Sequence, residues 1–124
     1  MRRWIAVAAV LLLAFAVHAE VYTLNADGTG DYANIQSAIN ACVSGDVIQL
    51  EDGVYTGSGN RDIDFAGKTI TLCGVSGNAE DCIIDIEGVH GNYVSERGLM
   101  IDSGEGPETT IRDLSIINGD GDGS

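Results

Sequence analysis

The sequence has few basic residues, and this shortage excludes two classes of partner. Only 6 of its 124 residues are Lys or Arg, against 19 Asp or Glu. Without Arg2 and Arg3, which lie in an N-terminal segment that we expect to be removed, four basic residues face 19 acidic ones, a net charge of −15. A chain this acidic repels nucleic-acid phosphates and anionic membrane surfaces. We therefore expect no nucleic-acid partner and interpret the acidic side chains as a solvated surface.

Cysteine motifs for metal binding or redox chemistry are also missing. The three cysteines, Cys42, Cys73 and Cys82, show neither a CxxC spacing nor a Cys/His pattern typical of zinc. In an exported protein a disulfide between Cys73 and Cys82 is permissible, and it would close the loop between two strands. The alternative is that each thiol packs as a small apolar side chain. An odd count leaves at least one thiol unpaired within the chain.

The only long apolar run lies near the N-terminus, at residues 4–17. It follows a short basic start and is shorter than the roughly 20 residues of a membrane-spanning helix. Val17-His18-Ala19 places small residues at the third and first positions before a cleavage site. These features predict a signal peptide at residues 1–19, cleaved between Ala19 and Glu20, and a mature domain at 20–124. We expect a secreted or cell-surface protein with no membrane span after cleavage.

Proline is nearly absent, with one residue, whereas glycine occurs 17 times. Glycine together with Asp, Asn and Ser indicates many turns. The apolar content, 44%, is too high for a disordered chain. Many turns, many short strands and little helix favour an all-β architecture.

One amphipathic helix is predicted at residues 32–43. Its apolar residues fall at i, i+3, i+4 and i+7 and form a single face: Ile35, Ala38, Ile39 and Cys42. Asp31 lies where an N-cap residue is expected. Gly45 can adopt the left-handed conformation that often ends a helix. Such a helix would cover an apolar surface that otherwise meets water.

Short alternating segments typical of strands occupy most of the remaining chain, at residues 20–24, 46–50, 54–56, 62–65, 69–72, 82–86, 98–102 and 110–118. Three of them can be aligned with later ones. Ile48-Gln49-Leu50 returns as Ile84-Asp85-Ile86, and Ile63-Asp64-Phe65 returns as Leu99-Met100-Ile101, in each case 36 residues on. Thr69-Ile70 returns as Thr110-Ile111, 41 residues on. Repeats of this size predict a solenoid, here a parallel β-helix of about two coils capped by helix 32–43.

Several motifs resemble the opening of the pectin-lyase-like superfamily of right-handed parallel β-helices. They are Gly28-Thr29-Gly30-Asp31-Tyr32, Ile35-Gln36-x-Ala38-Ile39, Gly45-Asp46-x-Ile48-x-Leu50-x-x-Gly53-x-Tyr55, Asp81-Cys82-Ile83-Ile84-Asp85 and Leu114-Ser115-Ile116-Ile117-Asn118-Gly119. The resemblance covers residues 21–119 and implies an all-β, right-handed, single-stranded parallel β-helix with an N-terminal capping helix. It is specific for fold and weakly specific for activity, because pectinesterases, pectate lyases and surface proteins open similarly.

Lyases of this superfamily use acidic residues to hold calcium and a basic residue to take a proton, and pectinesterases use an Asp pair with Arg and Gln. The outward candidates here are Asp64, Asp85, Asp102, Asp113, Arg97 and Arg112. We expect Asp85 and Asp102 on different faces and Arg112 and Asp113 pointing oppositely on one strand. No catalytic signature is matched, so we assign no catalytic residue and leave the question of an enzyme open; we interpret these side chains, and His90, as solvated surface.

The last residues fit the first half of a calcium-binding loop, Asn118-x-Asp120-x-Asp122-Gly123. The alternatives are a Gly/Asp turn and, for Asn118, the start of an inward asparagine stack. We predict no cofactor and keep calcium as the alternative. Asp27-Gly28-Thr29-Gly30 lacks the lysine of a phosphate loop, and we interpret it as a turn.

These observations predict an exported scaffold that presents a surface to polysaccharide or to the cell envelope, with no complete catalytic site. The alternative is the N-terminal part of a pectate-lyase-like or pectinesterase-like enzyme whose active coils lie beyond residue 124. The last predicted strand ends in a Gly/Asp turn without a closing helix. We therefore expect a fragment, with the missing coils or another chain covering the open end.

Overall fold

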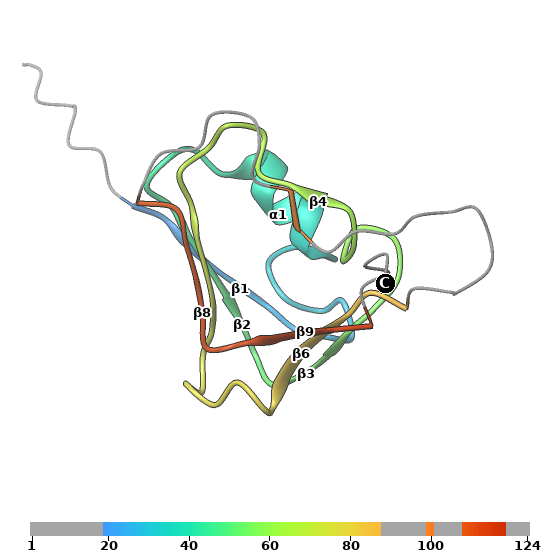
Figure 1. The fold of residues 1–124 in the computed structure, drawn as a ribbon. Helices are drawn as coiled ribbons and strands as arrows, with labels where there is room; N and C mark the ends of the chain where they lie inside the picture. The colour runs from blue at the N-terminus through green and yellow to red at the C-terminus, as the bar shows by residue number, and fades with distance from the viewer. Residues whose placement is uncertain (1–18, 88–98, 101–107, 119–124) are drawn as a thin grey trace, which may run out of the picture.

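The computed structural model describes residues 19–87, 99–100 and 108–118 (Figure 1). In chain order the elements are β1 (Val21–Leu24), α1 (Ile35–Ala41), β2 (Val47–Leu50), β3 (Gly53–Tyr55), β4 (Ile63–Asp64), β5 (Thr71–Gly74), β6 (Cys82–Asp85), β7 (Leu99–Met100), β8 (Thr110–Arg112) and β9 (Ser115–Ile117). Residues 1–18 of the expected signal peptide, which is predicted at 1–19, lie outside the described part. No helix within the described ranges is long and apolar enough to cross a membrane.

The described strands pair in parallel and form three small sheets, in the orders β1-β2-β5-β8, β3-β6-β9 and β4-β7. Figure 1 shows the first two sheets meeting at an angle, with β4 and α1 on the side opposite their junction. Sequence neighbours such as β2 and β3 therefore lie in different sheets, and each strand pairs with one much further along the chain. The sheets and the helix enclose one apolar core.

The core follows from the alternation of side chains along each strand, since every second residue points to the same face. Ile48 pairs with Leu72, and Leu24 with Leu50, and these four side chains are fully buried. Tyr55 pairs with Ile84 in the three-stranded sheet, and both are buried. Burying each large apolar side chain contributes about 1.5–3 kcal/mol.

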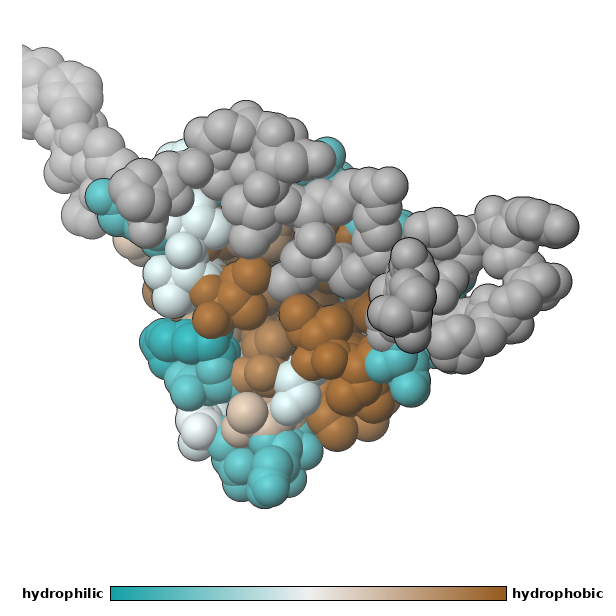
Figure 2. Space-filling model, viewed as in Figure 1, coloured by the Kyte–Doolittle hydropathy of each residue, from teal (hydrophilic) through white to brown (hydrophobic). Residues whose placement is uncertain are grey.

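Apolar side chains also reach the surface on the face of the molecule shown in Figure 2. In β9, Ile116 and Ile117 are 41% and 40% exposed. Ile111 and Leu114 are partly buried and pack against the core from the same end of the chain. The core is thus less completely covered beside the last strands than beside α1.

Helix α1 is shorter than the predicted helix 32–43, and its N-cap is Asn34 rather than Asp31. The Asn34 side chain accepts a hydrogen bond from Ser37 N (2.9 Å), and Ser37 Oγ accepts one from Asn34 N (3.3 Å). Asp31 is engaged elsewhere, because its N–H and its carboxylate both bond the backbone of Thr23 (2.8 Å each). This capping box starts the helix one turn later than the pattern suggested.

The C-terminus of the helix also differs from the prediction, whereas its apolar face is confirmed. The helix ends at Ala41, and its C-cap is Cys42, whose backbone is extended; Gly45 has a φ of +102° but does not cap the helix. The four apolar residues of the predicted face are all buried: Ile35, Ala38, Ile39 and Cys42. The side chain of Gln36 both accepts from Asp64 N (2.8 Å) and donates to Asp64 O (3.0 Å). This double contact fastens α1 to β4.

The predicted fold class is wrong. We expected an all-β, right-handed, single-stranded parallel β-helix, but no solenoid is detected in the described residues, which form short parallel strands in separate sheets with one small helix. Ile48 pairs with Leu72 and not with Ile84, and Thr110 pairs with Thr71 and not with Thr69. Of the three predicted alignments, only that of Ile63-Asp64 with Leu99-Met100 is confirmed.

The physical reason is that the loops do not keep a constant length. The partner of Val47 is 24 positions on, at Thr71, whereas the partner of Thr71 is 39 positions on, at Thr110. The predicted strand 110–118 is likewise interrupted at Asp113, whose φ of +61° turns the chain from β8 into a different sheet at β9. Register here follows the burial of apolar side chains and not a fixed repeat.

Candidate functional site

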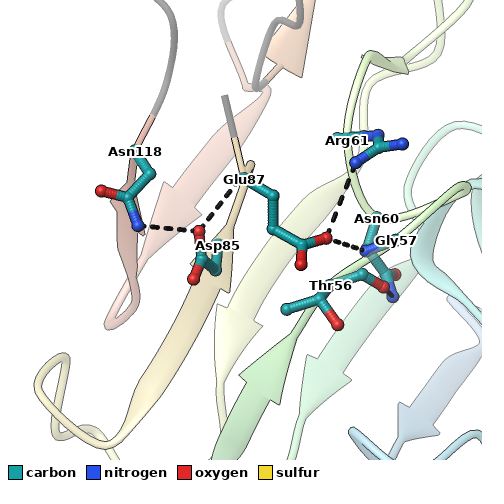
Figure 3. Close-up of polar contacts among 7 residues, drawn as sticks. All are labelled: Thr56, Gly57, Asn60, Arg61, Asp85, Glu87 and Asn118. Carbon is teal, nitrogen blue, oxygen red and sulfur yellow. Dashed lines mark hydrogen bonds and ion pairs between the residues drawn. The ribbon is translucent and has the colours of Figure 1, made fainter. Parts of the chain in front are cut away.

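Four polar side chains form a row where the chain leaves β6 and β9, beside the loop that follows β3 (Figure 3). We call this row the corner ladder, and it consists of Asn118, Asp85, Glu87 and Arg61. Asp85 is the last residue of β6, and Asn118 directly follows β9. Glu87 and Asn118 both have a φ of +56°, so the chain turns sharply at these positions. The ladder therefore joins three segments that are far apart in the sequence.

Hydrogen bonds hold the ladder together. Asp85 Oδ1 accepts from Asn118 Nδ2 (2.9 Å) and from Glu87 N (3.0 Å). Glu87 Oε1 accepts from Gly57 N (3.2 Å) and lies 3.6 Å from Arg61 Nη1. The order of groups is an amide, two carboxylates and a guanidinium, as Figure 3 shows. Each carboxylate oxygen named here already accepts a bond, while the side chains of Arg61 and Glu87 remain 28% and 49% exposed.

The loop beneath the ladder is fixed by Asn60, which is 7% exposed. Its Oδ1 accepts from Ile35 N at the start of α1 (2.9 Å), and its Nδ2 donates to Thr56 O (2.9 Å). Because these bonds are made in a buried position, they restrain the loop that carries Gly57 and Arg61. The segment that contributes Arg61 to the ladder is therefore anchored to the start of α1.

The other residues considered from sequence are dispersed. Asp64 Oδ1 accepts from Ala66 N (2.8 Å) in a local turn. Arg112 and Asp113 were expected to point oppositely, but they form an ion pair, because Asp113 lies in the bend after β8 and not in the strand. The remaining candidates lie outside the described residues: His90, Arg97, Asp102, Asp120 and Asp122. Asp85 and Asn118 are the sequence candidates that the structure brings together in one polar cluster.

Sequence reasoning missed Glu87 and Arg61 as site residues and did not place Asn118 beside Asp85. One alternative for Asn118 is an inward asparagine stack. In the structure Asn118 is exposed, and its side-chain amide donates a hydrogen bond to the carboxylate of Asp85. The pattern Asp85-x-Glu87, at the end of the predicted strand 82–86, is a signal that could have pointed to this corner. Arg61 carried no such signal, because it meets Glu87 only through the pairing of β3 with β6.

The three cysteines are free thiols, and all are buried. The disulfide considered between Cys73 and Cys82 is not formed, and packing as small apolar side chains is the observed alternative. Burial raises the pKa of the Cys42 and Cys82 thiols to about 11 each. These thiols therefore stay protonated and inert at neutral pH.

Neither a pocket nor a group of three or more His, Cys, Asp or Glu side chains suited to a metal is found in the described part of the chain. Comparisons with protein-family models, characterised proteins and solved structures found no match. The resemblance to the pectin-lyase-like superfamily therefore stays a prediction from the motifs quoted above.

Proposed function

We propose that the mature chain is an exported scaffold that binds polysaccharide through the corner ladder. The observation that carries the proposal is the row of amide, carboxylate and guanidinium groups held by three separate segments (Figure 3). Sugar hydroxyls both donate and accept hydrogen bonds, and this row offers both kinds of partner. A row fixed before binding also loses little conformational freedom when a glycan docks.

Charge selects the class of polysaccharide. The chain without its first 19 residues has 4 basic and 19 acidic side chains, so an anionic polysaccharide would be repelled at low salt. Hydroxyl groups of a neutral polysaccharide can instead donate to the carboxylates of Asp85 and Glu87, and hydrogen bonds to ionised acceptors are the stronger ones. We therefore name neutral polysaccharides of a cell wall or envelope as the partner class, consistent with the export expected from residues 1–19.

The experiment is a depletion isotherm of the exported protein on insoluble neutral polysaccharides, with polygalacturonate as the anionic comparison. Loss of one charge-assisted hydrogen bond should weaken binding about 10–100-fold in Asp85→Asn and Glu87→Gln. Glu80→Gln is the matched control, because it removes the same charge from an exposed side chain outside the ladder. Binding that the ladder variants leave unchanged would contradict the proposal.

The same samples test the enzyme alternative. Polygalacturonate incubated with the protein and calcium is assayed for unsaturated products and for reducing ends. Product release would replace the scaffold by a pectate-lyase-like activity. Neutral-glycan binding without product release is the outcome that we expect.

A further inference from the structure

The first described residues of the chain are held against a buried carboxylate. Glu20 N lies 3.0 Å from Asp46 Oδ1, and Glu20 O accepts from Val47 N at 2.9 Å. Asp46 is only 2% exposed, whereas Ala19 and Glu20 are both exposed. The peptide bond between Ala19 and Glu20 is therefore at the surface, while the nitrogen of that bond points to an interior charge.

Asp46 links this nitrogen to two other parts of the fold. Its second oxygen, Oδ2, accepts from Val43 N (2.8 Å), just after the end of α1. Its backbone O accepts from Thr71 N (3.1 Å), at the start of β5. Both side-chain contacts are with neutral N–H groups, and no ion pair joins Asp46 to a basic side chain in the described part of the chain. A buried carboxylate that lacks a cationic partner carries a large desolvation cost. The site is thus built for one more positive charge.

We propose that cleavage between Ala19 and Glu20 supplies this charge, converting the contact with Asp46 from a neutral hydrogen bond into an ion pair. The proposal rests on the export that is part of the proposed function. Hydrolysis adds one water, which leaves a carboxylate on Ala19 and an amino group on Glu20. An α-amino group has a pKa of about 7.7–8.0 and is mainly charged at neutral pH.

The geometry needs no rearrangement. The nitrogen that becomes an ammonium is already 3.0 Å from Asp46 Oδ1, and the bond from Val47 N holds Glu20 in place. A charge-assisted hydrogen bond is about twice as strong as a neutral one. The processed chain is therefore more stable than its precursor, because processing strengthens the contact through which Asp46 joins the residue before β1 to the end of α1.

The test compares two forms of the chain, both exported from the full-length precursor and both checked by intact mass. One has the native sequence. The other carries one glycine inserted between Ala19 and Glu20, so that processing leaves Glu20 N as an amide and moves the ammonium one residue away. Each form is also made with Asp46→Asn.

We expect the glycine insertion to lower Tm by about 4–8 °C when Asp46 is present, and to have little effect in the Asp46→Asn background. An equal fall in both backgrounds, or no fall in either, would overturn the ion pair. An intact mass that does not correspond to a chain starting at Glu20 would overturn the cleavage step.

A second measurement covers the case in which Asp46→Asn does not fold. The α-amino group of the native form should be acylated about tenfold more slowly than that of the glycine-inserted form, since an adjacent carboxylate favours the charged, unreactive amine. Equal rates would refute the contact. The polysaccharide isotherm is run on the same native sample, so that loss of glycan binding and loss of the ion pair are read separately.

Discussion

Replacing Tyr55 by phenylalanine isolates the contribution of one buried hydroxyl group. Tyr55 is 1% exposed, and its Oη lies 2.7 Å from Glu51 O and 3.0 Å from Leu24 O. The hydroxyl thus connects β3 to the end of β1 and to the turn after β2. Phenylalanine keeps the buried ring and removes only this connection, so the apolar contribution to stability is unchanged.

The magnitude follows from the carbonyl groups that lose their partner. Leu24 O keeps a bond from Glu51 N (3.0 Å), but the hydroxyl proton shared with Glu51 O is lost. Glu51 O is part-buried, and leaving an acceptor shielded from water without a donor costs about 1–3 kcal/mol. We therefore expect the free energy of unfolding of Tyr55→Phe to fall by about 1–3 kcal/mol.

Urea unfolding followed by circular dichroism measures this change, with the slope m as a check that the unfolded state is unaltered. Tyr32→Phe is the matched control. The Tyr32 ring is half-buried and packs edge-on against the Tyr22 ring, with the two ring centroids 5.3 Å apart. The Tyr32 hydroxyl makes no hydrogen bond within the described ranges. We expect the control to lie within about 0.5 kcal/mol of the native protein. A Tyr55→Phe variant as stable as the control would refute the reasoning.

Further predictions concern the helix, a close glycine and the thiols. Gln36→Ala removes both hydrogen bonds to the backbone of Asp64 and should lower the free energy of unfolding, measured in urea, by about 1–3 kcal/mol. A change below about 0.5 kcal/mol, which is typical of an exposed surface substitution, would contradict this. Gly30→Ala should prevent stable folding, because the added Cβ would lie 2.5 Å from Thr23 O. Gly77→Ala adds a Cβ with no atom within 4 Å but at a φ of +75°, so it should lower the free energy of unfolding by only about 1 kcal/mol in the same assay. A thiol reagent should find no reactive cysteine in the native protein and three in denaturant; a single one in denaturant would indicate a disulfide. Burial raises the pKa of Cys42 and Cys82 from 9.0 to about 11. The free energy of unfolding should therefore be constant below about pH 9 and fall between about pH 9 and 11, because only the thiols of the unfolded chain lose protons in that range. Urea midpoints that stay level up to about pH 11 would contradict this.

Patterns of burial could be predicted from the sequence, because they depend only on local periodicity. The apolar face of α1 and the inward positions of β2 and β5, Ile48 and Leu72, follow from spacings of three to four and of two residues. The helix start could not be predicted, because Asp31 and Asn34 are both good N-caps and a distant residue, Thr23, engages the first of them.

Strand partners and the corner ladder depend on the register between distant segments. Ile48 has equally apolar candidates at Leu72 and Ile84, and local periodicity does not distinguish them. In the structure Ile48 pairs with Leu72, and Ile84 pairs with Tyr55. The same uncertainty hides the ladder, since Glu87 reaches Arg61 only when β6 lies beside β3. From the sequence, Asp85 is interpreted as solvated surface, and only the pairing of β3 with β6 shows which residues lie beside it.

The unequal separations between paired strands have a consequence for how this chain can diversify. Partners 24 and 39 positions apart keep the same inward rows, so the core does not constrain how many residues each connection contains. Doubling a flexible connection costs only about 0.6 kcal/mol in closure entropy. The turn between β5 and β6 is a natural place for such growth, because a side chain added at Gly77 meets no atom within 4 Å. Peptides grafted there could give the molecule new recognition surfaces while its interior stays as it is.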